Sequence, residues 1–174
     1  PYENLPDTQW KKVTKKLVNE HPLSSDILID TVLKAWNGIL NTKIADELQI
    51  GRDIFPTPQI LGNYLHELIP VFLEKKYPGQ WTRDIEKKDK DLVCVANPYY
   101  SVEIKTSSNA NNIYGNASYG QEDSASASSK TKDGYYLAVN FEKFNPSNKD
   151  FIPRIRKIRF GWLDHSDWHS QNAS

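Results

Sequence analysis

The stretch Tyr99-Tyr100-Ser101-Val102-Glu103-Ile104-Lys105 decides the fold, together with the run Asp91-Leu92-Val93-Cys94-Val95 before it. Side chains alternate across a β-strand, so Glu103 and Lys105 face one side and the aliphatic residues between them face the other. Each run is typical of a strand that packs its apolar side on a core. The two runs therefore predict a hairpin whose charged residues gather on one face.

The connection between these runs decides whether a second carboxylate joins that face. Asn97-Pro98-Tyr99 predicts a three-residue connection, which pairs Asp91 with Lys105. Directly paired residues share a face, so Asp91 would lie beside Glu103, whereas a connection one residue shorter would turn it away. Asp89 has the same parity, and the alternation leaves both residues open. Asp91 is favoured because it directly precedes the apolar run.

Length and composition bound the class of protein. The 174 residues, of which 38% are hydrophobic, suffice for one domain with a core. The 22 basic and 22 acidic residues cancel, which argues against a protein that simply coats nucleic acid. Cys94 is the lone cysteine, so a reducing compartment is expected. The sequence contains no signal peptide pattern and no apolar run of about 18 residues, so we expect neither export nor a membrane span.

The first half of the chain predicts helices. Pro70 is expected to kink the last of them, because proline lacks the backbone N–H that an interior helical position needs. Start and stop signals and apolar spacing define four helices: one with its apolar stripe between Trp10 and Val18, one capped by Ser24-Ser25-Asp26, a short one from Ile44 to Gly51, and one from Thr57-Pro58 to about Pro78-Gly79.

From Trp81 onward the pattern changes to strands. Besides the two runs above, strands are expected at 81–85, 134–144 and 154–163. Helices followed by strands predict an α+β fold, with a helical N-terminal region and a mixed, mostly antiparallel sheet flanked by helices. We divide the chain into a helical region at 1–56, for dimerisation or packing, and a core at 57–174.

The connection at 106–133 is too long and too polar for an ordinary loop. Ser124 to Ser129 has the composition of a flexible surface loop. The stretch before it mixes aromatic residues, glycines and amides, which can contact bases and phosphates. The basic residues near 154–159 fit either a phosphate-facing strand or a solvated edge strand. The expected DNA contacts are Ser107, Tyr114, Asn116, Ser118, Tyr119, Gln121, Arg154 and Arg156.

Hard oxygen ligands converge in the predicted hairpin. The carboxylates of Asp91 and Glu103 and the Ile104 carbonyl suit Mg²⁺, which would hold a phosphodiester oxygen and acidify a water. Lys105 would orient that water. Glu67, on the helix from Thr57, either completes the metal shell or lies at the flank of the buried helix face.

A second set of metal-binding residue types lies near the end of the chain. His165 and His169 are four residues apart, a spacing that binds zinc on a helix. The first histidine is not followed by glutamate, and no third ligand is clear. A polar loop is the favoured interpretation.

Asp91, Glu103-Ile104-Lys105 and the preceding helix with Glu67 resemble the PD-(D/E)XK nuclease superfamily over residues 57–163. More narrowly the chain is similar to bacterial type II restriction endonucleases, and most specifically to ScaI-type cutters. Members often carry Pro-Asp at the first acidic position, whereas Lys90 precedes Asp91 here.

The resemblance implies a restriction-endonuclease-like core and a homodimer in the bacterial cytoplasm that cleaves a short palindromic site in double-stranded DNA with Mg²⁺. The N-terminal helices, with Trp10 and Trp36, would form the dimer contact or pack into the core. Two alternatives remain open. One is a structure-specific or repair nuclease with the same site, and the other is a non-catalytic DNA-binding module.

Overall fold

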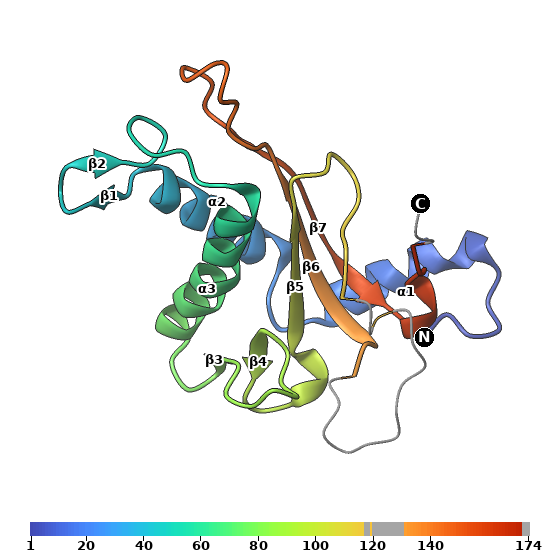
Figure 1. Cartoon of the computed structure of the whole chain (residues 1–174). Helices are drawn as coiled ribbons and strands as arrows, with labels where there is room; N and C mark the ends of the chain where they lie inside the picture. Colours follow the sequence, from blue (N-terminus) through green and yellow to red (C-terminus); the bar gives the residue numbers. More distant parts are fainter. Residues whose placement is uncertain (117–118, 120–130, 172–174) are drawn as a thin grey trace.

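A five-stranded mixed sheet organises the protein (Figure 1). The computed structural model describes residues 1–116, 119 and 131–171. Along the sheet the strands follow their order in the sequence, and only β5 and β6 run parallel. The strands are β3 (Trp81–Arg83), β4 (Leu92–Cys94), β5 (Val102–Ser107), β6 (Gly134–Phe141) and β7 (Ile155–Leu163). The predicted α+β class, with a mixed and mostly antiparallel sheet, is confirmed.

Three helices precede the sheet: α1 (Asp7–Glu20), α2 (Ser25–Leu40) and α3 (Pro58–Lys76). Ser24 caps α2 as expected, because its side chain accepts a hydrogen bond from the Ile27 amide. Pro58 starts α3, where its missing N–H removes no helical bond. Pro70 is buried inside α3, and the helix continues beyond it to Lys76.

The predicted short helix between Ile44 and Gly51 is wrong. These residues form a small antiparallel hairpin, β1 (Lys43–Ile44) and β2 (Leu48–Gln49). Ala45 and Asp46 have φ values of 56° and 55°, which lie in the left-handed region and break a right-handed helix. The apolar spacing covers barely two turns, too few to outweigh the nucleation cost of a helix.

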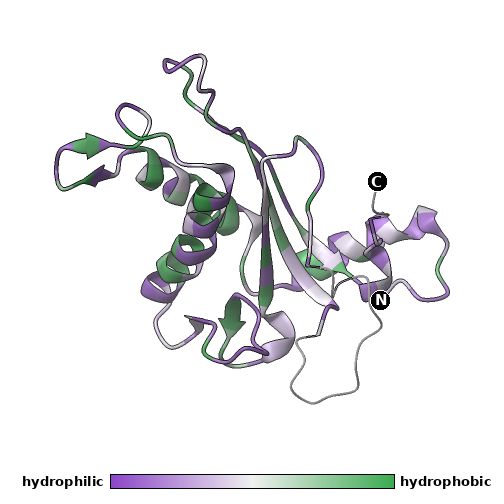
Figure 2. Cartoon of the chain, viewed as in Figure 1, coloured by the Kyte–Doolittle hydropathy of each residue, from purple (hydrophilic) through white to green (hydrophobic). Residues whose placement is uncertain are grey.

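The two faces of the sheet have different roles. The helix face carries Val102, Ile104, Leu137 and Val139, which pack into one core with α2 and α3 on the same side of the sheet (Figure 1). Hydrophobic residues dominate this interior, whereas the connection after β5 is mostly hydrophilic (Figure 2). The opposite face, called the polar face below, carries Glu103, Lys105 and Ser107 of β5 and the residues paired with them, Tyr136, Ala138 and Asn140 of β6.

Helix α3 approaches β5 very closely at Gly62. A Cβ added at this glycine would lie 2.7 Å from the Thr106 hydroxyl, so a larger residue would push the helix away from the strand. The next residue on that side of the helix, one turn later, is His66. The close packing therefore brings His66 near β5.

The β4–β5 register differs from the prediction by two residues. Leu92 pairs with Val102, and the connection holds a 3₁₀ helix at Pro98–Tyr100. The predicted pairing of Asp91 with Lys105 is therefore wrong, and the same register places Asp91 opposite Glu103. Because the shift is an even number of residues, the predicted faces are unchanged.

The parallel pairing of β5 and β6 explains the long connection at 106–133. Both strands start at the same end of the sheet, so the chain must return along the whole strand before β6 begins. The described part of this return passes over the polar face, where Tyr136, Ala138 and Asn140 are buried and Asn140 hydrogen-bonds the connection.

The N-terminal helices share the core with the sheet. Trp36 is 3% exposed and its indole N–H donates to the Pro153 carbonyl at 3.1 Å, whereas Trp10 is 38% exposed. These helices were expected either to form a dimer contact or to pack into the core, and Trp36 packs into the core. None of the described helices combines the length and apolar character needed to cross a membrane.

His21 links the end of α1 to the sheet as a neutral ring. Nδ1 accepts from the Leu23 amide at 3.1 Å and Nε2 lies 2.8 Å from the Tyr100 carbonyl, which fixes the proton on Nε2. Burial lowers the pKa of His21 below its ordinary value of 6.5. A charged ring would lose the bond from Leu23, so acid should destabilise this junction.

We expect the free energy of unfolding to fall as the pH drops below 6.5, because the unfolded chain protonates His21 before the folded chain does. The slope from this one group is at most about 1.4 kcal/mol per pH unit. Urea unfolding of the wild type and of His21→Gln at several pH values measures it. An equally steep loss in both proteins would contradict the assignment.

Candidate active site

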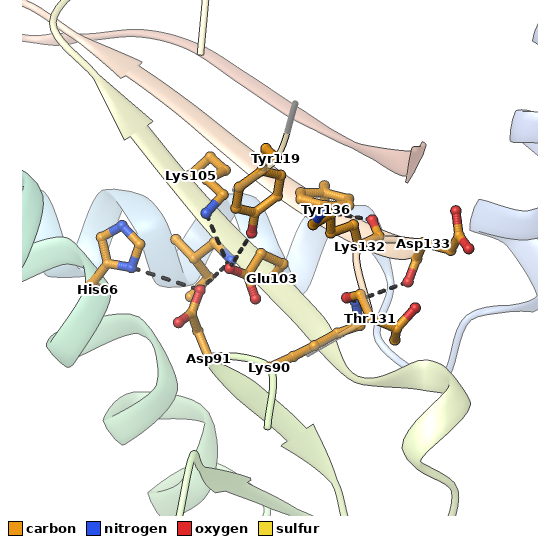
Figure 3. A network of polar contacts seen from close by, with 11 residues as sticks. His66, Lys90, Asp91, Glu103, Lys105, Tyr119, Thr131, Lys132, Asp133 and Tyr136 are labelled. Atoms are coloured by element: carbon orange, nitrogen blue, oxygen red, sulfur yellow. Dashed lines mark hydrogen bonds and ion pairs between the residues drawn. The ribbon is translucent and has the colours of Figure 1, made fainter. Parts of the chain in front are cut away.

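Asp91 and Glu103 meet at the edge of β5 where β4 begins (Figure 3). One carboxylate oxygen of Asp91, Oδ2, accepts the Ile104 amide N–H at 2.7 Å. Glu103 precedes Ile104 on the polar face, and its side chain is 5% exposed. This hydrogen bond fixes Asp91 beside the strand, so the carboxylates of Asp91 and Glu103 flank the same peptide unit.

Lys105 and Tyr119 both contact the Glu103 carboxylate. Lys105 Nζ donates to Oε1 at 3.1 Å, and the Tyr119 hydroxyl donates to the same oxygen at 3.0 Å (Figure 3). The Lys105 ammonium also lies 4.4 Å from the centre of the Tyr119 ring, within cation–π range. Tyr119 therefore covers both charged groups of the Glu-Ile-Lys motif.

The chemistry of this oxygen set fits a hard divalent cation. In an extended strand the N–H and C=O of one residue point to the same edge, so the Ile104 carbonyl points to the Asp91 side, as its amide does. Two carboxylates and a carbonyl are ligands that Mg²⁺ accepts, with water completing the shell. Among the described residues, no group of three or more His, Cys, Asp or Glu is placed to hold a metal ion.

Asp89 and Asp91 have different surroundings. Asp89 accepts the amides of Ile85 and Glu86 at 3.0 and 2.8 Å, which closes the turn before β4. The structure thus brings Asp91, and not Asp89, to the edge of β5.

Lys90 occupies the position where the family often has proline. Its side chain is buried and its ammonium donates to the carbonyls of Thr131 and Asp133 at 3.2 and 3.0 Å. Gly134 has φ of 142°, and a Cβ there would lie 2.8 Å from Lys90 Nζ. Lys90 therefore ties the start of β4 to the start of β6, directly beside the metal-ligand candidates.

Helix α3 brings His66 to the site, a residue that the sequence analysis missed. His66 Nδ1 lies 3.7 Å from Asp91 Oδ2. Glu67, the residue expected to help hold the metal, is exposed and lines a shallow pocket with Glu74, Thr82 and Arg83. The close approach at Gly62, one turn before His66, is the sequence signal that would have pointed to the histidine.

Known proteins resemble this chain over its whole length. The model of the ScaI restriction endonuclease family matches residues 1–174. The type II restriction enzyme ScaI of Streptomyces caespitosus is 44% identical over 173 residues, which cover 99% of this chain and 75% of that enzyme. No solved structure matches the chain.

The chain belongs to the ScaI restriction endonuclease family. The predicted resemblance to type II restriction endonucleases is thereby confirmed, and so is the predicted enzyme class. Type II restriction enzymes generally need a divalent metal, which is consistent with the oxygen ligands at Asp91 and Glu103.

In this ScaI-family chain, the phenols near Glu103 are held neutral. Burial, and then the negative charge of Glu103, raises the pKa of both Tyr119 and Tyr136 far above the ordinary value of 10.0. Both rings pack against Trp168, at 4.6 and 5.6 Å between centroids. Each phenol can therefore serve as a hydrogen-bond donor but not as a base.

The second histidine motif forms no metal site among the described residues. His165 starts a 3₁₀ helix, His165–Asp167, and its Nε2 lies 3.2 Å from the Tyr119 carbonyl. This region thus supports the position of Tyr119.

The expected DNA contacts of this ScaI-family chain are dispersed. Ser118 and Gln121 lie outside the described residues. Tyr114 and Asn116 are exposed in the connection, and Ser107 Oγ accepts the Asn109 amide at 3.0 Å. Tyr119 lies against the Glu-Ile-Lys motif.

The basic strand β7 contains a bulge. Asn140 pairs with Lys157 and Phe141 with Ile155, so Arg156 is an extra residue on β7. Lys157 and Arg159 lie on the polar face, because their partners Asn140 and Ala138 do. Of the arginines expected to bind DNA, Arg156 is exposed at the bulge. The other, Arg154, pairs with Glu142 at 3.2 Å.

Tyr119→Phe should tighten metal binding about tenfold, because the metal no longer has to displace a phenol hydrogen bond from Glu103. Calorimetric titration of the DNA-free protein with Mg²⁺ measures this change. Tyr64→Phe, in an exposed tyrosine of α3, is the matched control and should bind Mg²⁺ as the wild type does. Equal affinity in all three proteins would show that Tyr119 does not compete with the metal.

Proposed function

We propose that this protein is a sequence-specific endonuclease that hydrolyses phosphodiester bonds in double-stranded DNA with Mg²⁺ at a short palindromic site. The observation that supports this most directly is the position of Asp91 beside the Glu103-Ile104-Lys105 strand, within a chain of the ScaI family. The oxygen ligands suit a hard cation, and a lysine lies 3.1 Å from one of them.

The site residues have distinct tasks in the proposed reaction. Asp91, Glu103 and the Ile104 carbonyl hold Mg²⁺, which when bound neutralises charge on the scissile phosphate and favours ionisation of the attacking water. The Ile104 amide and His66 fix the orientation of Asp91. Lys105, held by Glu103, orients the water and stabilises the charge that develops as the phosphate is attacked.

DNA has to reach the polar face of the sheet, because the helix face is filled by the core. Glu103 is nearly buried and Tyr119 lies over it, so access requires Tyr119 to leave Glu103 and Lys105. The proposed role of Tyr119 is therefore to cover the motif in the absence of DNA. Glu67 stays a candidate for binding a second metal-associated water at the rim of the site.

We further propose a homodimer, since a palindromic site calls for two-fold symmetry. Neighbouring helices α2 and α3 each expose an apolar pair one turn apart, Ile29 with Leu33 and Ile60 with Tyr64. Residues 1–56 would then contribute to dimerisation as well as to the core. The proposed compartment is the bacterial cytoplasm, where the DNA substrate is present and Cys94 stays reduced.

Lys105→Ala should lower the cleavage rate at least about 100-fold while DNA binding persists, because only the group that orients the water and stabilises the developing charge is lost. Cleavage of labelled duplex and its gel shift in Ca²⁺ report the two properties separately. Lys88→Ala removes an exposed lysine that pairs with Glu86, and it should cleave normally. Normal cleavage by Lys105→Ala would end the assignment of the site.

Incubation of the purified protein with mixed duplex DNA and Mg²⁺, followed by sequencing of the fragment ends, tests the function itself. One recurring palindrome at the ends is the expected result. Nicks or scattered ends would instead indicate the structure-specific or repair nuclease. Binding without cleavage would indicate the non-catalytic DNA-binding module.

A further inference from the structure

We propose that Asn140 and Arg159 are positioning residues that hold residues 109–116 in place to read DNA bases beside the scissile phosphate. This inference rests on the proposed function, and it names the part of the chain that sets site preference. Neither Asn140, Arg159 nor residues 109–116 belong to the proposed metal ligands. The observations that carry it are a buried amide, an anchored arginine and the outward-facing side chains between them.

Asn140 lies in the middle of β6 on the polar face and is 0% exposed. Its amide nitrogen donates to the carbonyls of Asn109 and Asn112 at 2.9 and 3.0 Å, and its oxygen accepts from Arg159 at 2.9 Å. Burying an amide is unfavourable unless its hydrogen bonds are made. Here both donors and the acceptor are used: the two donated bonds fasten the returning chain to the sheet, and the accepted bond links Asn140 to Arg159 of β7.

Arg159 fastens the same segment from β7. Its guanidinium donates to the Asn111 carbonyl at 2.6 Å while holding Asn140, and Lys157 donates to the Asn111 side chain at 2.8 Å. Within the segment, the side chain of Asn109 accepts the amides of Asn111 and Asn112 at 3.0 and 2.9 Å. Residues 109–112 are thus fixed by their own turn and by two cations.

The opposite end of the segment is fixed by close packing. A Cβ on Gly115 would lie 2.7 Å from Cγ of Tyr119, so the backbone there lies directly on the tyrosine ring. Tyr119 in turn hydrogen-bonds Glu103. In the absence of DNA the segment is therefore held at both ends, and when Tyr119 leaves Glu103 the anchor made by Asn140 and Arg159 remains.

Between these anchors, three side chains are exposed. Asn112, Tyr114 and Asn116 are exposed, and their side chains make no hydrogen bond to any residue that the structure describes. Asparagine can bind adenine through two hydrogen bonds in the major groove, and tyrosine can contact phosphate. A rigid backbone carrying such groups is suited to reading sequence, because less ordering entropy is lost on binding.

The β5–β6 register places residues 109–116 close to Lys105. Lys105 pairs with Ala138, and Ser107 pairs with Asn140, so the anchor lies two residues along the sheet from Lys105. That separation is about 7 Å, or about two base steps of a DNA strand. The contacted bases should therefore lie within a few base pairs of the cleaved bond.

The decisive comparison is between two arginines of the same strand. Arg159→Gln and Arg156→Gln each remove one positive charge, but only Arg159 is bonded to Asn140 and Asn111. Both variants should weaken DNA binding through the lost charge. Only Arg159→Gln should lower the ratio of cleavage at the preferred site to cleavage at single-base variants of it, by about tenfold.

Asn140→Asp provides an independent variant. It retains an acceptor for Arg159 but replaces the donors to Asn109 and Asn112 with a repelling oxygen. We expect the same loss of discrimination, together with faster amide hydrogen exchange at residues 111 and 112. If this variant does not fold, judged by its thermal melt, Arg159→Gln alone decides the matter.

The possible results separate the inference from the function on which it rests. Loss of discrimination in Arg159→Gln but not in Arg156→Gln supports the inference. Equal discrimination ratios in both variants and the wild type would overturn it while leaving the endonuclease intact. Equal losses in both arginine variants would also overturn it, since they would show that charge alone matters. A wild type that cleaves no duplex with Mg²⁺ would remove the proposed function and the inference together.

Discussion

The parallel pairing of β5 and β6 is the constraint on which the site depends. It places Glu103 beside Tyr136 and Lys105 beside Ala138, and it forces the chain to return over the polar face before β6 can begin. A hairpin connection would have left this face open to solvent. With parallel strands, the connection that the topology requires also supplies the cover of the motif and the exposed segment next to it.

Much of the site was predictable because it depends on alternation and not on register. The β4–β5 pairing moved by two residues, yet Asp91 stayed on the side of Glu103, since only an odd shift exchanges the faces. The helix caps at Ser24 and Pro58 were equally local and equally predictable. Features that follow from one residue's immediate neighbours survive errors in the longer-range arrangement.

The errors came from contacts that a single helix or strand does not encode. On α3, His66 was missed because its position depends on the close contact of Gly62 with Thr106 of β5. The prediction for β7 named Arg154 and Arg156 and did not include the bulge. Ile155 and Ile158 are three residues apart, whereas strict alternation requires an even spacing. That spacing was the available signal that Lys157 and Arg159 share the polar face.

Lys90 shows how the chain departs from the Pro-Asp pattern without losing the position of Asp91. A proline would restrict the backbone before the aspartate directly. Here the buried Lys90 ammonium binds the carbonyls of Thr131 and Asp133, so β4 is fastened to β6 instead. Arg159 binds the Asn111 carbonyl near the start of the connection between β5 and β6. Two cations, Arg159 and Lys90, therefore hold the two described ends of this connection. In this chain of zero formal net charge, basic residues thus order the connection over the polar face through backbone carbonyls.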